Sequence, residues 1–168
     1  MNRLQTGTSP RPSAKAPLFP RTLSLPFALL PDLLHGRAVV SALNRIFATA
    51  LREGELDFMQ GRTLRVVIQD MQLRFCLTLA RDRLTALPET RAADLSIKGN
   101  LHAFLLMASR REDSDTLFFQ RLLRMEGDTE LGLALKNFLD GQDLDSSPLI
   151  RQLEAALQRL LPLYERWF

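Results

Sequence analysis

Alternation of apolar and polar residues is clearest in the middle of the chain. In residues 64–69 and again in residues 72–79, apolar side chains occupy every second position. This alternation predicts two strands that each bury one face, and the short Asp70-Met71 connection predicts an antiparallel hairpin. Shorter runs predict three further strands, at Arg83–Leu87, Asp94–Lys98 and Leu122–Met125.

Helical periodicity lies on both sides of these strands. From Asp32 onward apolar residues recur at three- and four-residue steps, and Gly54 is placed to end that helix. Asn100 is predicted to cap a second helix, and residues 114–121 form a further helical turn. A third helix is predicted to begin after Asp128 and to end at Gly141. This order predicts an α+β domain, in which helices cover one face of an antiparallel sheet of about five strands.

Prolines set the N-terminal part of the chain apart. Residues 1–20 are predicted to be a disordered tail, residues 21–144 the domain, and residues 145–168 a C-terminal amphipathic helix. Residues 18–34 are strongly apolar but interrupted by prolines, which disfavours regular structure. Two interpretations of that segment remain open: an irregular strap across the core, or a contact with a membrane surface.

Composition excludes several classes of protein. The 22 Lys and Arg residues exceed the 19 Asp and Glu residues by three and are spread along the chain, so no nucleic-acid stripe is indicated. Cys76 is the only cysteine, which rules out an internal disulfide and favours a reducing compartment. No apolar run reaches the roughly 18–20 residues that cross a bilayer. We therefore expect a cytoplasmic protein, with peripheral contact at the inner membrane as an open alternative.

Candidate catalytic and metal-binding groups are sparse. His35 and His102 have no Cys, His or carboxylate at metal-ligand spacing, and His102 is expected to be an exposed helix residue. Five acidic residues cluster between Asp113 and Glu130, but Asp115 and Asp128 precede helical patterns and are better explained as helix caps. The sequence therefore predicts no catalytic residue, metal or cofactor, and no enzyme.

Apolar side chains are the remaining candidates for a functional site. We expect eleven of them to face inward and to line a lipid site: Phe75, Leu77, Leu95, Ile97, Phe104, Leu105, Phe118, Phe119, Leu131, Leu135 and Phe138. An ordinary, filled hydrophobic core accounts for the same set of residues, so their composition alone does not distinguish a core from a binding site.

Two ordered segments carry a family resemblance. Residues 115–121 (DTLFFQR) and 126–133 (EGDTELGL) resemble the lipid-binding domains of the sterol carrier protein type, and within them the ubiquinone-biosynthesis accessory factors. The resemblance implies a sheet covered by helices that encloses an apolar tunnel. It also implies a non-enzymatic role in oxygen-independent ubiquinone synthesis: binding prenylated intermediates or ubiquinone and presenting them to the hydroxylating partners UbiU and UbiV.

A long prenyl tail places a physical demand on such a protein. Each five-carbon unit contributes roughly 3–4 kcal/mol when it is buried, so the tail stays in the bilayer unless a protein offers comparable apolar surface. Pockets of roughly 300–1,000 Å³ are small for a long tail. This favours an open-ended tunnel, a groove at the membrane surface, or a homodimer that shares the tail. A general phospholipid-binding peripheral protein and a scaffold with a filled core remain as alternatives.

Overall fold

The computed structural model describes residues 32–109 and 111–141, with side chains from residue 36 onward, and the single positions 155, 159, 162 and 166. The predicted N-terminal tail, all but the end of the apolar segment 18–34, and most of the predicted C-terminal helix lie outside the described residues. The four single positions in residues 145–168 are helical and exposed.

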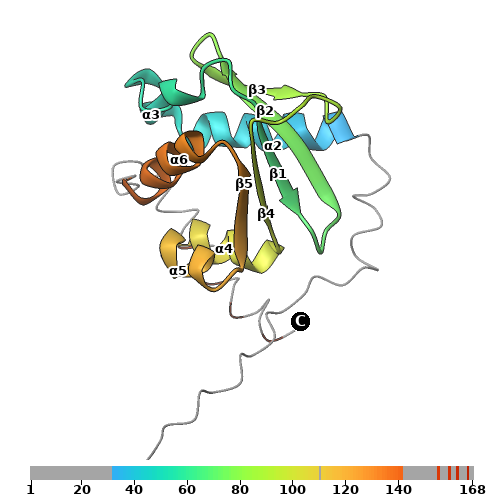
Figure 1. Ribbon diagram of the computed structural model, residues 1–168, viewed down its shortest axis with the longest axis vertical. Coiled ribbons are helices and arrows are strands. Elements are labelled where there is room, and N and C mark those ends of the chain that lie inside the picture. Colours follow the sequence, from blue (N-terminus) through green and yellow to red (C-terminus); the bar gives the residue numbers. More distant parts are fainter. Residues whose placement is uncertain are drawn as a thin grey trace, which may run out of the picture.

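The sheet has five strands in the order β3-β2-β1-β4-β5 (Figure 1). Their bounds are Leu64–Ile68 (β1), Leu73–Ala80 (β2), Arg83–Leu87 (β3), Leu95–Gly99 (β4) and Leu123–Gly127 (β5). The predicted hairpin is confirmed, because β1 and β2 pair antiparallel with Val66 opposite Phe75.

The expectation of a purely antiparallel sheet is wrong. Strands β1 and β4 run parallel, with Val66 opposite Ile97, while all other neighbours are antiparallel. The chain leaves β3 at one edge and returns as β4 on the far side of β1, so the sheet is mixed. Alternation reports which side chains share a face, and it carries no information about the direction of the neighbouring strand.

The helices lie at the predicted places. Their bounds are Asp32–Ile46 (α2), Ala48–Arg52 (α3), Leu101–Ala108 (α4), Ser114–Phe119 (α5) and Thr129–Gly141 (α6), with a short 3-10 turn at Asp57–Met59 (η1). The expected first helix is broken at Phe47, and Gly54 follows its second part with φ +74°. Asn100 is the N-cap of α4, but its side chain makes no capping bond. Instead the amide of Leu101 donates to Asp70 Oδ1 at 2.9 Å.

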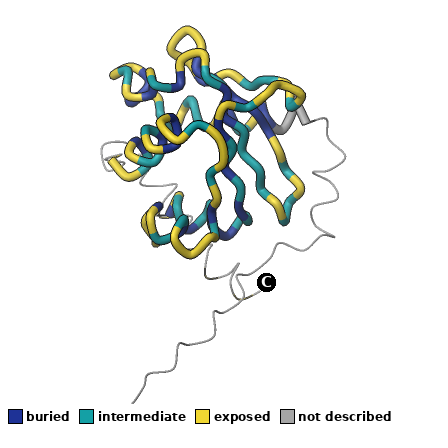
Figure 2. Tube along the Cα trace, viewed as in Figure 1, coloured by how far each residue is buried: buried dark blue, intermediate teal, exposed yellow. Residues whose placement is uncertain are grey.

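One face of the sheet is apolar and carries the helices. Across the strands, Phe75, Val66, Ile97 and Met125 are paired in sequence and so share this face. A Cβ on Gly36 of α2 would lie 3.3 Å from the Cβ of Phe75, and one on Gly132 of α6 would lie 3.4 Å from Met125 Sδ. Both helices therefore pack on the same side of the sheet, as the sequence predicted, and Figure 2 shows buried positions along the sheet between them.

The opposite face of the sheet is polar. The paired positions Arg74, Val67, Lys98 and Arg124 share it, and Lys98 makes an ion pair there with Glu126. This division between two faces places the hydrophobic core, and any apolar binding site in the described part, on the side of the helices.

Helix α2 closes the β3 end of the molecule. The side chain of Asn44 donates to Leu84 O at 2.8 Å and accepts from Leu84 N at 2.9 Å, which satisfies both backbone groups of Leu84 on this edge strand. The β5 end of the sheet is different, and the candidate site lies there.

Candidate functional site

A groove of about 710 Å³ runs along the outer strand β5, between α5 and α6. Its floor is apolar, and its walls combine apolar and charged residues. The residues that line it are Leu95, Asp115, Phe118, Arg121, Leu123, Arg124, Met125, Glu126, Gly127, Asp128, Thr129, Gly132, Leu133 and Lys136.

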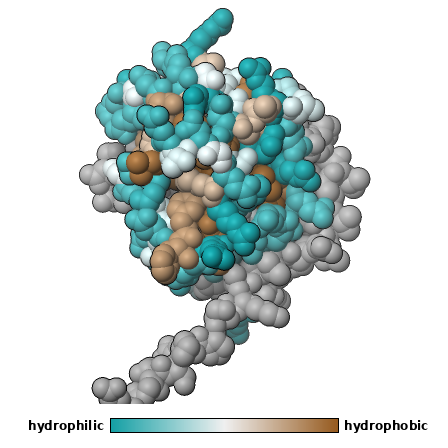
Figure 3. Space-filling view, viewed as in Figure 1, coloured by the Kyte–Doolittle hydropathy of each residue, from teal (hydrophilic) through white to brown (hydrophobic). Residues whose placement is uncertain are grey.

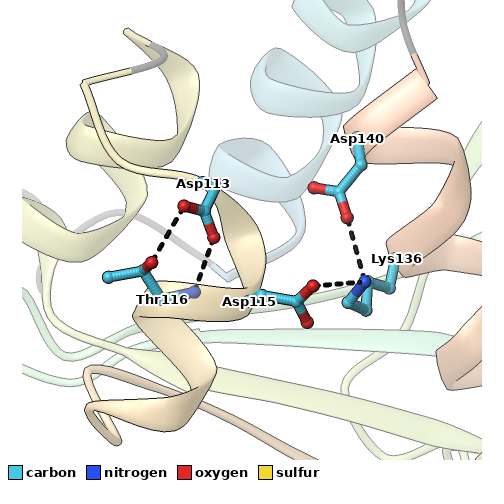
Figure 4. A network of polar contacts seen from close by, with 5 residues as sticks. All are labelled: Asp113, Asp115, Thr116, Lys136 and Asp140. Carbon is cyan, nitrogen blue, oxygen red and sulfur yellow. Dashed lines mark hydrogen bonds and ion pairs between the residues drawn. The ribbon is translucent and has the colours of Figure 1, made fainter.

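Asp113 fixes the start of α5, the first wall of the groove. Its Oδ1 accepts from the amide of Thr116 at 2.7 Å, and its Oδ2 accepts from the Thr116 hydroxyl at 2.8 Å (Figure 4). These hydrogen bonds lower the pKa of the Asp113 carboxyl below its ordinary value. The expectation that Asp115 caps this helix is wrong by two residues. Asp115 lies in the first turn and points away from the capping bond.

Lys136 joins the two walls of the groove. Its Nζ lies 3.1 Å from Asp115 Oδ2 on α5 and 3.1 Å from Asp140 Oδ2 one turn along α6 (Figure 4). The hydrogen bonds to Asp140 and Asp115 raise the pKa of Lys136, so the lysine stays charged. The ion pair with Asp115 connects α6 to α5 across the groove.

A sharp turn positions α6, the second wall. Gly127 ends β5 with φ +122°, and a Cβ there would lie 2.2 Å from the carbonyl oxygen of Asp94, so only glycine fits. The predicted cap is confirmed at the next residue, because Asp128 Oδ1 accepts from Leu131 N at 3.0 Å. That hydrogen bond, together with the neighbouring Arg62 guanidinium, lowers the pKa of the Asp128 carboxyl.

Glycine also creates the space in the groove. Gly132 faces the sheet from α6, and a Cβ there would lie 3.4 Å from Met125 Sδ and 3.5 Å from Leu95 Cδ1. A larger side chain at this position would therefore fill the floor. Because Leu95 is itself buried in the core, the floor of the groove is continuous with the hydrophobic core.

Each of the two helices that border the groove carries one exposed large apolar side chain. Phe119 on α5 is 91% exposed and Leu133 on α6 is 58% exposed, and these are the exposed large hydrophobic residues of the described part. Figure 3 shows apolar surface gathered over α5 and beside the groove. Arg121 and Arg124 also line the groove, and neither has an ion-pair partner among the described residues. The arrangement suits an amphiphilic or apolar ligand rather than a reaction.

The eleven residues expected to line a lipid site are divided by the structure. Leu95 and Phe118 line the groove. Six others are buried in the core and two are half-buried against it: Phe75, Leu77, Ile97, Leu131, Leu135 and Phe138, and then Phe104 and Leu105. The expectation that Phe119 faces inward is wrong, because the side chain that follows Phe118 on a short helix points to the other side. Lipid contact by these residues stays a prediction.

Sequence reasoning missed most of the residues that line the groove. Leu123 and Met125 alternate on the apolar face of β5, so their spacing could have identified them. Gly132, Leu133 and Lys136 could not be recognised in this way, because their role depends on how closely α6 approaches β5 and α5.

Other candidate groups take no part in this groove. Cys76 is a free, fully buried thiol, as expected for a small apolar side chain on a strand. His102 is buried rather than exposed, so that expectation is wrong: its side of α4 turns toward the core. Among the described residues no group of three His, Cys, Asp or Glu side chains could hold a metal ion. None of the helices in the described part is long and apolar enough to cross a bilayer.

Residues 42–140 match the SCP-2 sterol transfer family, and the chain belongs to that family. The match covers the whole sheet and the helices from the later part of α2 to the last but one residue of α6. A solved structure, "UbiJ-SCP2 Ubiquinone synthesis protein", supports the fold with a TM-score of 0.53 at 16% identity, covering 64% of this chain and 94% of that one.

Within the family, the chain resembles one group of relatives. It is 38% identical over 131 residues to the "Ubiquinone biosynthesis accessory factor UbiT" of Escherichia coli K12, covering 78% of this chain and 75% of that protein. The protein of the same name from Escherichia coli O157:H7 matches to the same extent. The protein is therefore a UbiT-like member of the SCP-2 family, which confirms the resemblance seen in residues 115–121 and 126–133.

Proposed function

We propose that the protein is a non-enzymatic accessory factor of oxygen-independent ubiquinone biosynthesis. It binds ubiquinone or its prenylated intermediates at an apolar site that opens in the groove between α5 and α6. It then presents the aromatic head of the ligand to hydroxylating partner enzymes, the role that the family resemblance gives to UbiU and UbiV. Its place of work is the cytoplasmic side of the inner membrane.

The observation that carries this proposal is the groove itself. It combines a volume of about 710 Å³, a floor continuous with the hydrophobic core, and the exposed apolar side chain of Leu133 in its lining. A buried prenyl unit contributes roughly 3–4 kcal/mol, so a groove of this kind can compete with lipid for part of a tail. The relation to UbiT supplies the ligand class.

The size of the groove favours an open lipid site over an enclosed one. Its volume lies within the usual range for small-molecule pockets, roughly 300–1,000 Å³, which a long polyprenyl tail exceeds. An open groove leaves the remainder of the tail in contact with other apolar surface, such as the bilayer. An enclosed tunnel stays a prediction from the family resemblance.

The test is to purify the protein from cells that make ubiquinone and to identify bound lipids by mass spectrometry. Prenylated quinones or their precursors are expected in the wild-type protein. Phospholipids alone would favour a general phospholipid-binding protein, and a protein free of lipid would contradict both.

A variant that fills the groove tests whether the lipid binds there. Gly132→Leu places a side chain on the floor, between Met125 and Leu95, and should lower the amount of bound quinone at least about tenfold. Ala42→Leu is the matched control, because it adds apolar volume at an exposed position of α2 and should leave the bound lipid unchanged. Equal lipid content in both variants would place the ligand elsewhere.

A further inference from the structure

The two edge strands of the sheet differ in the hydrogen bonds made to their outward-facing backbone groups. At β3, Asn44 occupies both backbone groups of Leu84 on the free side of the strand. At β5, no described residue outside β4 hydrogen bonds to the backbone of Leu123–Gly127. An edge strand with free N–H and C=O groups is a template for pairing with another strand. The outward backbone groups of β5 therefore lack the kind of partner that Leu84 of β3 has in Asn44.

Strand β5 carries opposite charges at positions placed symmetrically about its central residue. The strand reads Leu-Arg-Met-Glu-Gly, with Arg124 and Glu126 on either side of Met125. If a second β5 pairs antiparallel about a two-fold axis at Met125, Arg124 of each copy lies opposite Glu126 of the other. Opposite charges at directly opposed positions stabilise a strand pair, and a two-fold axis makes the contact twice.

Both charges are available for such a contact. In the sheet register Arg124 is paired with Lys98 and Glu126 with Ser96, both residues also line the groove, and each is exposed. Arg124 has no ion-pair partner among the described residues, while Glu126 is paired with Lys98 on the neighbouring strand. A second copy would therefore place each Glu126 between two cations and give each Arg124 its missing carboxylate.

The exposed apolar residues agree with the same two-fold axis. Helix α5 precedes the Leu123 end of β5, and α6 follows its Gly127 end. Antiparallel pairing sets the Leu123 end of one copy beside the Gly127 end of the other, so α5 of each copy approaches α6 of its partner. Phe119 on α5 and Leu133 on α6, 91% and 58% exposed in the single chain, would be covered by this approach.

We propose that the protein forms a two-fold dimer through β5, which joins two five-stranded sheets edge to edge. The occupant of the β5 edge is a second copy of this chain, because the strand complements its own charges and because the exposed apolar residues lie on both sides of it. Dimer formation does not require the lipid, so it can fail while the proposed function holds.

Charge reversal tests the proposal on the full-length protein. Arg124→Glu sets two like-charged pairs across the axis and should weaken dimerisation at least about tenfold, measured by sedimentation velocity over a range of concentrations. The double variant Arg124→Glu/Glu126→Arg restores opposite charges and should dimerise again. Arg83→Glu is the matched control, because it makes the same change at an exposed position of the covered edge strand β3. Circular dichroism checks that each variant is folded.

A cross-link tests the register. Met125 lies on the proposed axis, so Met125→Cys should give an intermolecular disulfide on mild oxidation, since opposed residues in antiparallel strands have Cα atoms about 4.5–5.5 Å apart. Cys76 is fully buried and should not contribute. A wild-type protein that stays monomeric at all concentrations would overturn the proposal. So would a dimer that survives Arg124→Glu and is not cross-linked through position 125, since it would use another surface.

Discussion

The two ends of the sheet differ in how completely helices and side chains cover them. At the closed end, made of α2 with β2 and β3, the helix packs against Phe75 and the edge strand is sealed by Asn44. At the open end, made of β5 with α5 and α6, the two helices lie on either side of a groove and are connected by an ion pair of Lys136. From this difference we expect local unfolding to begin at the open end, where the proposed ligand would bind.

The largest expected change in the free energy of unfolding comes from a substitution at the closed end. Phe75→Ala removes a ring that is 6% exposed and lies directly under Gly36 of α2, so it should leave a cavity between helix and sheet. The free energy of unfolding should fall by about 3–5 kcal/mol, measured by urea denaturation. A loss below about 1 kcal/mol would show that this end is not the stable part of the domain.

A smaller loss is expected when the β3 edge is opened. Asn44→Ala removes two hydrogen bonds from Leu84 and leaves its backbone groups without that partner. The free energy of unfolding should fall by about 1–3 kcal/mol. The exposed edge should also increase self-association, which light scattering can measure. Ser41→Ala on the exposed side of α2 is the control and should change neither quantity.

Acid should loosen the open end before the closed end. The pKa values of Asp113 and Asp128 are both lowered in the folded protein, from an ordinary value of 3.8. A carboxyl with a lowered folded pKa stabilises the fold above its unfolded pKa, and that contribution is lost as pH falls below 3.8 through the folded pKa. Both groups cap helices of the open end.

Hydrogen exchange with mass spectrometry measures this order. Amides of Ser114–Phe119 and of the first turn of α6 should lose protection as the pH is lowered, while those of β1 and β2 keep theirs. Asp113→Asn should make exchange in α5 less dependent on pH. Uniform loss of protection across the sheet would contradict a difference between the two ends.

The smallest effect on stability is expected at Phe119. Phe119→Ser changes a residue that is 91% exposed, so the free energy of unfolding should change by no more than about 0.5 kcal/mol. The amount of bound prenylated lipid should fall if the ligand extends over α5, because the variant removes exposed apolar surface from the helix that carries the groove residue Phe118. Reduced lipid content at unchanged stability would separate binding from folding at the open end. Unchanged lipid content would exclude Phe119 from the site.

Several features of this protein follow from the sequence alone. Alternation in residues 64–69 and 72–79 correctly predicted a hairpin, and three- and four-residue spacing correctly placed the helices. The cap at Asp128 and the buried thiol of Cys76 were also predictable. These features depend on local periodicity and on hydrogen bonds between residues close in the chain, which a sequence displays directly.

Other features were decided only by the tertiary structure. The parallel pairing of β1 with β4, the burial of His102 and the outward position of Phe119 depend on contacts between distant segments. The groove does as well, since α6 approaches Met125 closely at Gly132 and an ion pair of Lys136 connects α6 with α5. The sequence determined which side chains are apolar and which element each belongs to. Packing between the elements decided which of them form the core and which line the groove.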